Sequence, residues 1–464
     1  MLLNNAGIDR KILEMHGKKS KVEVSANQPA VSFPPVLQLA ESGLDGVHRI
    51  GKPGASVSVA GDVNGDGLAD LLVNTNDEQL GVMYGISGGF ESDLSLSELD
   101  GTNGYVVEGS NDAATGVGDF NGDGLADILI ADRPSSFSDE PAVFYLLLGS
   151  IGGYGPNVVL SELDGSQGSK FTDPDSPSVQ GYSIGSAGDL NGDGLADLAI
   201  SEFRVGAGIT YVVYGSESGY RESLTLPMLG SGYGFVFKGF DTGDQAGFSI
   251  SPLGDLNADG SGELLIGAPL GDNRDTLFSR LGGSYQNFPS RQREDINNGE
   301  AYVIYGSSDG YRAEMTLWLQ GGDTNDNFGR SVSHAGDVNG DGIADLVIGA
   351  PNGGGFLDPV ADSVVYRDIG AGEAYVLYGD DVGDGISFAM SDLGRGDVSV
   401  LEGKRYVDTG RTVRSAGDLD GDGLSDLLIG AANRTYVVYG KEGGLGPRFS
   451  LASLDGVNGF AIGH

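Results

Sequence analysis

Apolar and polar positions along this chain form short segments, and no convincing helical periodicity separates them. An alternating segment such as SVSVAGD (56–62) or RSVSHAGD (330–337) leads into a glycine-rich turn and then into a short apolar run. An aromatic segment such as TYVVYG (210–215) comes next, and a last one follows a turn, as in LDGTNGYVVEG (99–109). β-branched and aromatic residues favour strands, and glycine-rich segments favour the turns between them. The pattern predicts a unit of four strands.

This unit recurs six times, because the same ten-residue acidic phrase precedes each apolar run. The phrase reads GDVNGDGLAD at 61–70, and its first aspartates are Asp62, Asp119, Asp189, Asp255, Asp337 and Asp418. Their spacings of 57 to 82 residues fit one supersecondary unit with loops of variable length, as in propellers or arrays. We expect repeats near 52–110, 111–180, 181–243, 244–327, 328–410 and 411–464.

Six four-stranded sheets cannot each bury a core alone, whereas radially arranged blades pack face to face and hide most of their edges. The predicted fold is therefore all-β: a β-propeller of four-stranded blades over residues 45–464, with the acidic phrases as loops between first and second strands. Residues 45–51 look like a last strand, although they precede the first repeat. A seventh blade that includes strands from residues 21–51 is favoured, and six blades are the alternative. Residues 1–44 are expected to be a tail that contributes strands to this closing blade.

Charge and composition narrow the classes of partner. The net charge is −39 with a sequence pI of about 4.1, which excludes nucleic acid as an expected ligand because phosphate binding needs a basic surface. The absence of cysteine excludes a disulfide scaffold and thiolate metal sites. No apolar run is long enough for a transmembrane helix, and residues 1–20 do not resemble a signal peptide. We expect either a cytoplasmic chain or an export signal elsewhere.

The acidic phrases point to bound cations, since 19 of the 66 acidic residues lie in them. In the first phrase Asp62, Asn64, Asp66 and Asp70 occupy positions 1, 3, 5 and 9, and Leu68 at position 7 can offer its backbone carbonyl. Such an all-oxygen shell with three negative charges suits Ca²⁺ better than Mg²⁺, and zinc is disfavoured without histidine or cysteine. Position 12 is apolar in all six phrases, which excludes an EF-hand because that loop needs a bidentate glutamate there.

The same positions recur in every repeat, so about six calcium sites are expected. The candidate metal ligands are Asp62, Asn64, Asp66, Leu68, Asp70, Asp119, Asn121, Asp123, Leu125, Asp127, Asp189, Asn191, Asp193, Leu195, Asp197, Asp255, Asn257, Asp259, Ser261, Glu263, Asp337, Asn339, Asp341, Ile343, Asp345, Asp418, Asp420, Asp422, Leu424 and Asp426. Asp-Gly turns alone would explain one such phrase, but a turn needs no acid at position 9. Repeat four is expected to bind most weakly, because Ala258 replaces a glycine and Glu263 replaces the last aspartate. A shell filled by protein oxygens indicates structural rather than catalytic ions.

The units resemble the FG-GAP repeats of the integrin alpha-chain propeller and its bacterial relatives. Repeat five contains Phe328-Gly329 followed by Gly349-Ala350-Pro351, and repeat four contains Gly267-Ala268-Pro269. The resemblance covers about residues 45–464. It implies a calcium-stabilised propeller, usually seven-bladed and extracellular, that is used for adhesion.

Two long insertions separate the second and third strands of repeats four and five, at 270–298 and 352–371. In integrin-like propellers these loops lie on the ligand face, opposite the calcium loops. Arginine and aromatic residues are typical interface anchors, although a surface loop without a partner is an equal alternative. The candidate partner-binding residues are Arg274, Arg280, Tyr285, Phe288 and Tyr366.

The sequence thus predicts a non-enzymatic adhesion or binding module for a protein or glycan, located outside the cell or on its surface. One alternative is a hydrolase or lyase that acts on polysaccharide and uses the propeller as a scaffold. Catalytic groups gathered from different blades around a central channel would not be visible as a motif. Another alternative is a structural unit of a surface array.

Overall fold

A computed structural model describes the fold of this chain for part of its residues. They are residues 37–38, 48–49, 56–75, 79–87, 95–109, 111–132, 141, 143–174, 181–217, 223–230, 232–257, 259–271, 298–309, 316–321, 326–353, 371–379, 388–389, 398–404 and 407–463.

Each repeat forms one antiparallel sheet whose four strands follow in chain order from the inside outward. The first sheet contains β3 (Ser56–Gly61), β4 (Asp70–Asn74), β5 (Leu80–Met83) and β6 (Gly104–Glu108). The second contains β7 (Asn111–Gly118), β8 (Asp127–Asp132), β9 (Val143–Leu147) and β11 (Gly168–Thr172). The third contains β12 (Ser183–Gly188), β13 (Asp197–Glu202), β14 (Ile209–Val213) and β16 (Gly234–Lys238).

The other three repeats have the same order. The fourth sheet contains β17 (Ser249–Gly254), β18 (Glu263–Ala268), β19 (Glu300–Tyr305) and β20 (Thr316–Gln320). The fifth contains β21 (Ser331–Gly336), β22 (Asp345–Ala350), β23 (Glu373–Leu377) and β25 (Val398–Glu402). The sixth contains β26 (Thr412–Gly417), β27 (Asp426–Ala431), β28 (Arg434–Val438) and β30 (Gly459–Gly463). The predicted four-strand unit is therefore confirmed.

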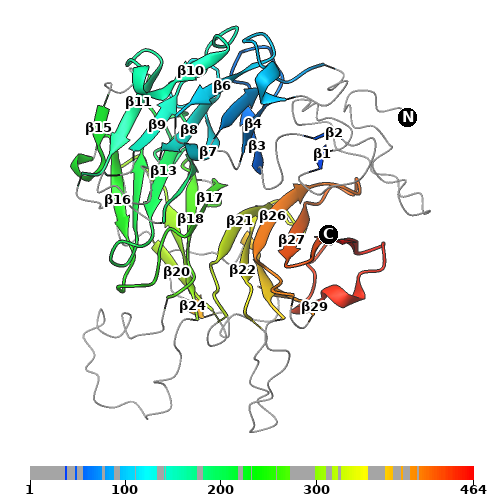
Figure 1. Ribbon diagram of the computed structural model, residues 1–464. Helices are drawn as coiled ribbons and strands as arrows, with labels where there is room; N and C mark the ends of the chain where they lie inside the picture. Colours follow the sequence, from blue (N-terminus) through cyan, green and yellow to red (C-terminus); the bar gives the residue numbers. More distant parts are fainter. Residues whose placement is uncertain are drawn as a thin grey trace, which may run out of the picture.

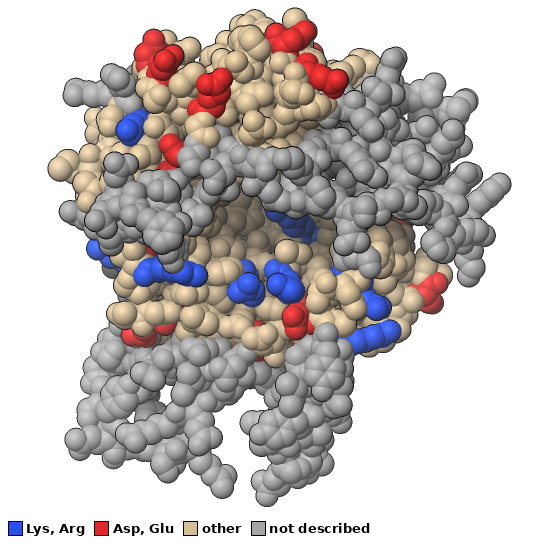
Figure 2. Space-filling view, viewed as in Figure 1, with Lys and Arg blue, Asp and Glu red and all other residues tan. Residues whose placement is uncertain are grey.

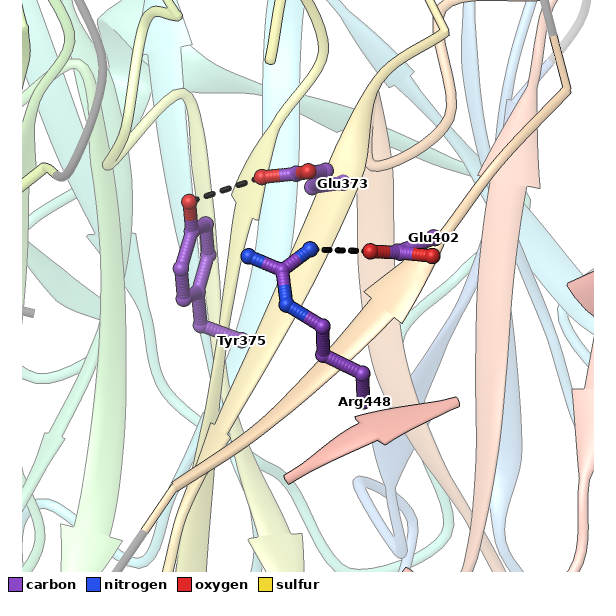
Figure 3. A network of polar contacts seen from close by, with 4 residues as sticks. All are labelled: Glu373, Tyr375, Glu402 and Arg448. Atoms are coloured by element: carbon purple, nitrogen blue, oxygen red, sulfur yellow. Dashed lines mark hydrogen bonds and ion pairs between the residues drawn. The ribbon is translucent and has the colours of Figure 1, made fainter. Parts of the chain in front are cut away.

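Four sheets carry a fifth strand that the sequence pattern did not predict. This short strand comes from the following repeat and pairs in parallel with the outer strand. The pairs are β10 (Asn157–Val159) with β6, β15 (Ser223–Thr225) with β11, β24 (Phe388–Ala389) with β20, and β29 (Arg448–Ser450) with β25. Single-turn 3-10 helices follow three of them, at Leu160–Glu162, Leu226–Met228 and Leu451–Ser453; a fourth such turn spans Leu96–Glu98. Arg448 of β29 also forms an ion pair with Glu402 of β25 (Figure 3), so each such strand ties one sheet to the next.

The hydrophobic core lies between successive sheets. Five core clusters each draw buried side chains from two neighbouring sheets, as where Ile348 and Tyr375 of the fifth meet Leu265 and Val303 of the fourth. The sheets follow one another around a common centre, from β3 through β17 to β26 (Figure 1). The inner strands of successive sheets lie side by side. This arrangement agrees with propeller blades, as expected from sheets that share their faces.

Close backbone approach between sheets explains the glycine of the Gly-Ala-Pro segment. A Cβ atom on Gly349 would lie 2.0 Å from the carbonyl oxygen of Gly410 in the next repeat. A Cβ on Gly267 would lie equally close to the carbonyl oxygen of Gly329. Such distances leave no room for a side chain, so glycine at this position permits the inner strands to pack.

The N-terminal region contributes one small sheet to the described residues. Strand β1 (Leu37–Gln38) pairs in parallel with β2 (His48–Arg49), and β2 lies within the segment 45–51 that the sequence predicted as a strand. In Figure 1 both strands lie between β3 and β26. The seventh blade stays a prediction, since the rest of residues 21–51 lies outside the described residues. In the described part of the chain, no helix has the length and apolar character to span a membrane.

Candidate metal centres

The six acidic phrases form loops at one end of the sheets. Each loop follows a bulge near the end of the inner strand, where the register with the second strand shifts by one residue. Bulges redirect a strand, and here the chain enters the loop directly after the bulge. The position-9 acid is the first residue of the second strand. It is fully buried in every repeat, as Asp70, Asp127, Asp197, Glu263, Asp345 and Asp426.

The position-9 carboxylate joins three parts of its repeat. In repeat five, Oδ2 of Asp345 accepts a hydrogen bond from the N–H of Val338 at 2.7 Å, and Oδ1 accepts one from the N–H of Gly379 at 3.0 Å. Equivalent pairs of bonds occur at Asp70, Asp127, Asp197 and Asp426. The loop, the second strand and the end of the third strand are thereby linked. The role of this glycine as a donor was not predicted from the sequence. The Tyr-Gly pair that follows most of the aromatic strands marks its position.

Burial is the main influence on these carboxyl groups. Desolvation raises the pKa of Asp70 and Asp426 to about 6 and that of Asp127, Asp197 and Asp345 to about 7. The backbone hydrogen bonds act in the opposite direction, and the neighbouring loop aspartates add a smaller upward effect. A buried carboxylate next to other carboxylates is costly without a cation, so the charge distribution of each loop favours a positive ion.

The side chains at positions 1, 3 and 5 shape the turn. In repeat one, Asp62 accepts hydrogen bonds from the N–H groups of Gly65 and Gly67 at 2.7 and 2.8 Å. Asn64 and Asp66 accept from the N–H groups two residues ahead, at 2.9 and 2.8 Å. Position 7 is different, because its carbonyl takes part in none of the hydrogen bonds described for the six loops. The side-chain oxygens therefore face inward, and a free carbonyl is available to join them.

Two loops bring their acids within range of a single ion. The carboxylate oxygens of Asp255, Asp259 and Glu263 in repeat four all lie within 4.8 Å of one another. Those of Asp418, Asp420 and Asp426 in repeat six do the same. Since Ca²⁺–oxygen bonds measure about 2.3–2.6 Å, two ligands of one ion lie at most about 5 Å apart. Both donor sets therefore fit calcium.

Repeat four contains a buried oxygen that a cation would satisfy. Oε2 of Glu263 accepts from the N–H of Leu256 at 2.6 Å. Among the described residues no hydrogen bond is found for Oε1, and the N–H of Gly306 donates to the carbonyl of Gly262. Desolvation raises the pKa of Glu263 to about 8. The expectation that this repeat binds most weakly stays a prediction, since the longer glutamate still reaches the other two acids.

All thirty candidate ligands lie within the described residues, and in the loops of repeats four and six three carboxylates come within 4.8 Å of one another. The five candidate partner-binding residues, Arg274, Arg280, Tyr285, Phe288 and Tyr366, lie outside the described residues. The two insertions that contain them separate β18 from β19 and β22 from β23. Because the acidic loops precede β18 and β22, the insertions begin at the opposite end of those strands.

Comparison with known proteins agrees with the repeat structure. Four segments match the FG-GAP repeat, at residues 53–82, 181–213, 328–377 and 410–445. The chain is 30% identical to integrin alpha-5 of Xenopus laevis over 263 residues, which is 56% of this chain and 21% of the relative. It is 28% identical to integrin alpha-PS5 of Drosophila melanogaster over 37% of this chain and 15% of the relative.

A third relative has a different description. The phosphatidylinositol-glycan-specific phospholipase D of Bos taurus is 31% identical over 181 residues, which is 37% of this chain and 18% of the relative. The chain thus spans between 15% and 21% of the length of these three curated relatives.

Proposed function

We propose that this chain, which carries FG-GAP repeats in four places, is a calcium-stabilised β-propeller that binds a protein or glycan outside the cell. The observation that carries the proposal is the sixfold recurrence of one loop, with a fully buried carboxylate at position 9 of each. Turns alone do not need this acid, and its burial among other carboxylates is unfavourable without a cation. The integrin alpha relatives support a binding role.

The oxygens at positions 1, 3, 5 and 9 and the position-7 carbonyl would hold each ion. A bound ion supplies positive charge to the loop and fixes the entry into the second strand. With free calcium at ten times Kd, each independent site would contribute about 1.4 kcal/mol, and six sites about 8 kcal/mol. That sum is comparable with the whole stability of a typical domain. Six divalent ions would also reduce the net charge from −39 to −27, which lowers self-repulsion.

Thermal unfolding in EDTA and in a calcium series, with magnesium as the ionic control, tests the proposal. We expect Tm to rise with calcium by on the order of 10 °C, since about 1 kcal/mol shifts Tm by a few degrees. Asp345→Asn should reduce the rise, whereas Glu162→Gln, an exposed change outside the loops, should not. Equal Tm in EDTA and calcium would refute calcium stabilisation.

The enzymatic alternative is not favoured, because the relatives at hand are mostly integrin alpha chains. The phospholipase D relative is nonetheless a reason to test turnover. A glycan array followed by product analysis separates the two functions. Retention of intact glycan supports a binding module, and released products would support a hydrolase or lyase.

A further inference from the structure

The starts of the inner strands form a second surface, at the end of the sheets opposite the acidic loops. Ser183, Ser249 and Ser331 begin β12, β17 and β21, and each donates its hydroxyl to a glycine carbonyl of the next repeat. The acceptors of the last two bonds are Gly329 and Gly410, both at 2.9 Å. These bonds place consecutive strand starts side by side. The residues immediately before them are therefore neighbours around the centre of the molecule.

The residues at this position form an arc of aromatic and basic side chains. They are Tyr182, Phe248, Arg330 and, before β26, Arg411. The Arg330 guanidinium lies over the Phe248 ring, 4.9 Å from its centroid, and the Phe203 ring also packs against it, with the two centroids 4.9 Å apart. The next residue, Arg204, extends its stem over Gly181, where a Cβ would lie 2.8 Å from Arg204 Cγ. The contacts continue from repeat three to repeat five.

Three guanidinium groups thus lie at this end of the third, fifth and sixth sheets. We call Arg204, Arg330 and Arg411 the arginine arc. Arg204 is exposed, and no hydrogen bond or ion pair is described for its guanidinium. Arg411 has a long contact of 3.9 Å with Asp408, and both side chains are about half exposed. An exposed pair of this kind contributes little, so the Arg411 guanidinium can exchange partners.

Three carboxylates at this end of the sheets are buried. Glu300 and Glu373 accept hydrogen bonds from Tyr302 and Tyr375 at 2.5 and 2.8 Å (Figure 3 shows the second pair). Asp326 is also buried. Figure 2 shows a row of Lys and Arg side chains along the hollow of this view, with a few Asp and Glu side chains below and beside them and others at the top of the molecule. A chain of net charge −39 therefore carries a row of basic side chains on this face.

We infer that the arginine arc binds a carboxylate-rich polypeptide segment of a partner protein. The inference rests on the proposed binding function and specifies the chemistry of its ligand. Guanidinium groups pair with carboxylates through two parallel hydrogen bonds. A peptide is favoured over an acidic glycan because the Arg330 guanidinium already lies over the Phe248 ring and Phe203 packs against the same ring, which leaves less of the ring for a sugar to stack on. At physiological ionic strength the Debye length is about 8 Å. Salt therefore screens the arginine arc from the charges of the acidic loops at the other end of the sheets.

Fluorescence anisotropy with labelled hexaglutamate in 0.15 M salt and calcium tests the inference. We expect saturable binding that weakens as salt rises, although the net charge of the chain repels the probe. Arg330→Gln combined with Arg411→Gln should weaken binding at least tenfold. Lys441→Gln is the matched control, because this exposed lysine lies beside the acidic loops, with its N–H bonded to the carbonyl of Val338. Arg411→Gln alone keeps the test valid if loss of the Arg330–Phe248 contact unfolds the chain.

Three results would overturn the inference: no saturable binding of hexaglutamate, equal loss in the arginine variants and in Lys441→Gln, or tighter binding of oligogalacturonate than of hexaglutamate. The calcium-dependent Tm of each protein is measured in parallel. If that shift is intact while hexaglutamate does not bind, the arginine arc inference fails and calcium stabilisation stands. If the shift is absent as well, the proposed function fails.

Discussion

The N–H of Gly379 donates a hydrogen bond to Oδ1 of Asp345, 34 residues earlier in the chain, at 3.0 Å. The other oxygen of this buried carboxylate accepts from Val338 at 2.7 Å. One side chain therefore satisfies two backbone donors and connects the acidic loop to the end of β23. The same acid therefore has a structural role besides the metal binding proposed for it.

Removal of this side chain should destabilise the fold even in EDTA. Asp345→Ala leaves the N–H groups of Val338 and Gly379 without their acceptor, at a cost of about 2–5 kcal/mol. Asp345→Asn keeps one acceptor oxygen, so we expect a smaller loss in EDTA and a clear loss of the calcium response. Urea unfolding with and without calcium measures both effects. Equal stability of the alanine and asparagine variants in EDTA would contradict the bridging role.

Calcium binding should be cooperative between neighbouring repeats. The N–H at position 8 of one loop donates to the position-1 carbonyl of the preceding loop, as from Ala126 to Asp62 and from Ser425 to Asp337, at 2.9 and 2.7 Å. An ion that orders one loop thereby positions a backbone group of the next. A calcium titration followed by intrinsic fluorescence or calorimetry should give a Hill coefficient above 1. A curve that fits identical independent sites would disprove this coupling.

Repeats four and five allow a matched comparison of their sites. Asp259→Asn and Asp341→Asn remove the same position-5 charge from the two loops. If repeat four binds most weakly, Asp259→Asn should reduce the calcium-induced rise in Tm less than Asp341→Asn does, because a site that is half filled contributes less free energy. A larger loss from Asp259→Asn would show that Glu263 makes repeat four the stronger site.

The serine hydroxyls between inner strands should contribute to cohesion of the sheets. Ser249→Ala and Ser331→Ala each remove a bond to the glycine carbonyl of the next repeat, so we expect a loss of about 1 kcal/mol per change. Ser333→Ala is the control, because its hydroxyl bonds only to the carbonyl of the adjacent His334. Chemical denaturation compares the three variants. Losses no larger than that of the control would exclude the contribution.

Glu300 should make stability depend on pH. Burial raises its pKa to about 8, with Asp244 and Asp241 adding to the rise and the Tyr302 hydroxyl opposing it. The folded state therefore holds a proton that the unfolded state releases near its ordinary pKa of 4.5. This contribution to stability is full below pH 4.5 and is lost as pH rises through 8.

Glu300→Gln removes this titration and keeps an acceptor for Tyr302. Between pH 5 and 9, with calcium saturating, we expect the free energy of unfolding of the wild type to fall by at least about 1 kcal/mol more than that of the variant. Urea unfolding at several pH values measures the difference. Parallel profiles for the two proteins would show that Glu300 does not titrate in this range.

The sequence determined the elements and the loops. Period-two segments, the Tyr-Gly ends of the aromatic strands and the acidic phrase are local signals, so the strands and the residues of each loop could be predicted without coordinates. The spacing of acids at positions 1, 5 and 9 also marked the candidate ligands, because a tight turn directs alternate side chains inward. These features depend on neighbours within about ten residues.

Only the tertiary structure decided how repeats contact one another. Three contacts join segments that lie 34 to 61 residues apart in the chain. They are the ion pair between Arg448 and Glu402, the close approach of the Gly410 carbonyl to Gly349, and the hydrogen bond from the N–H of Gly379 to Asp345. No local pattern specifies such partners, since each depends on the twist and stacking of whole sheets. The arginine arc has the same origin. Its three members are scattered from residue 204 to residue 411 of a strongly acidic chain; Arg330 and Arg411 directly precede inner strands, and Arg204 follows β13.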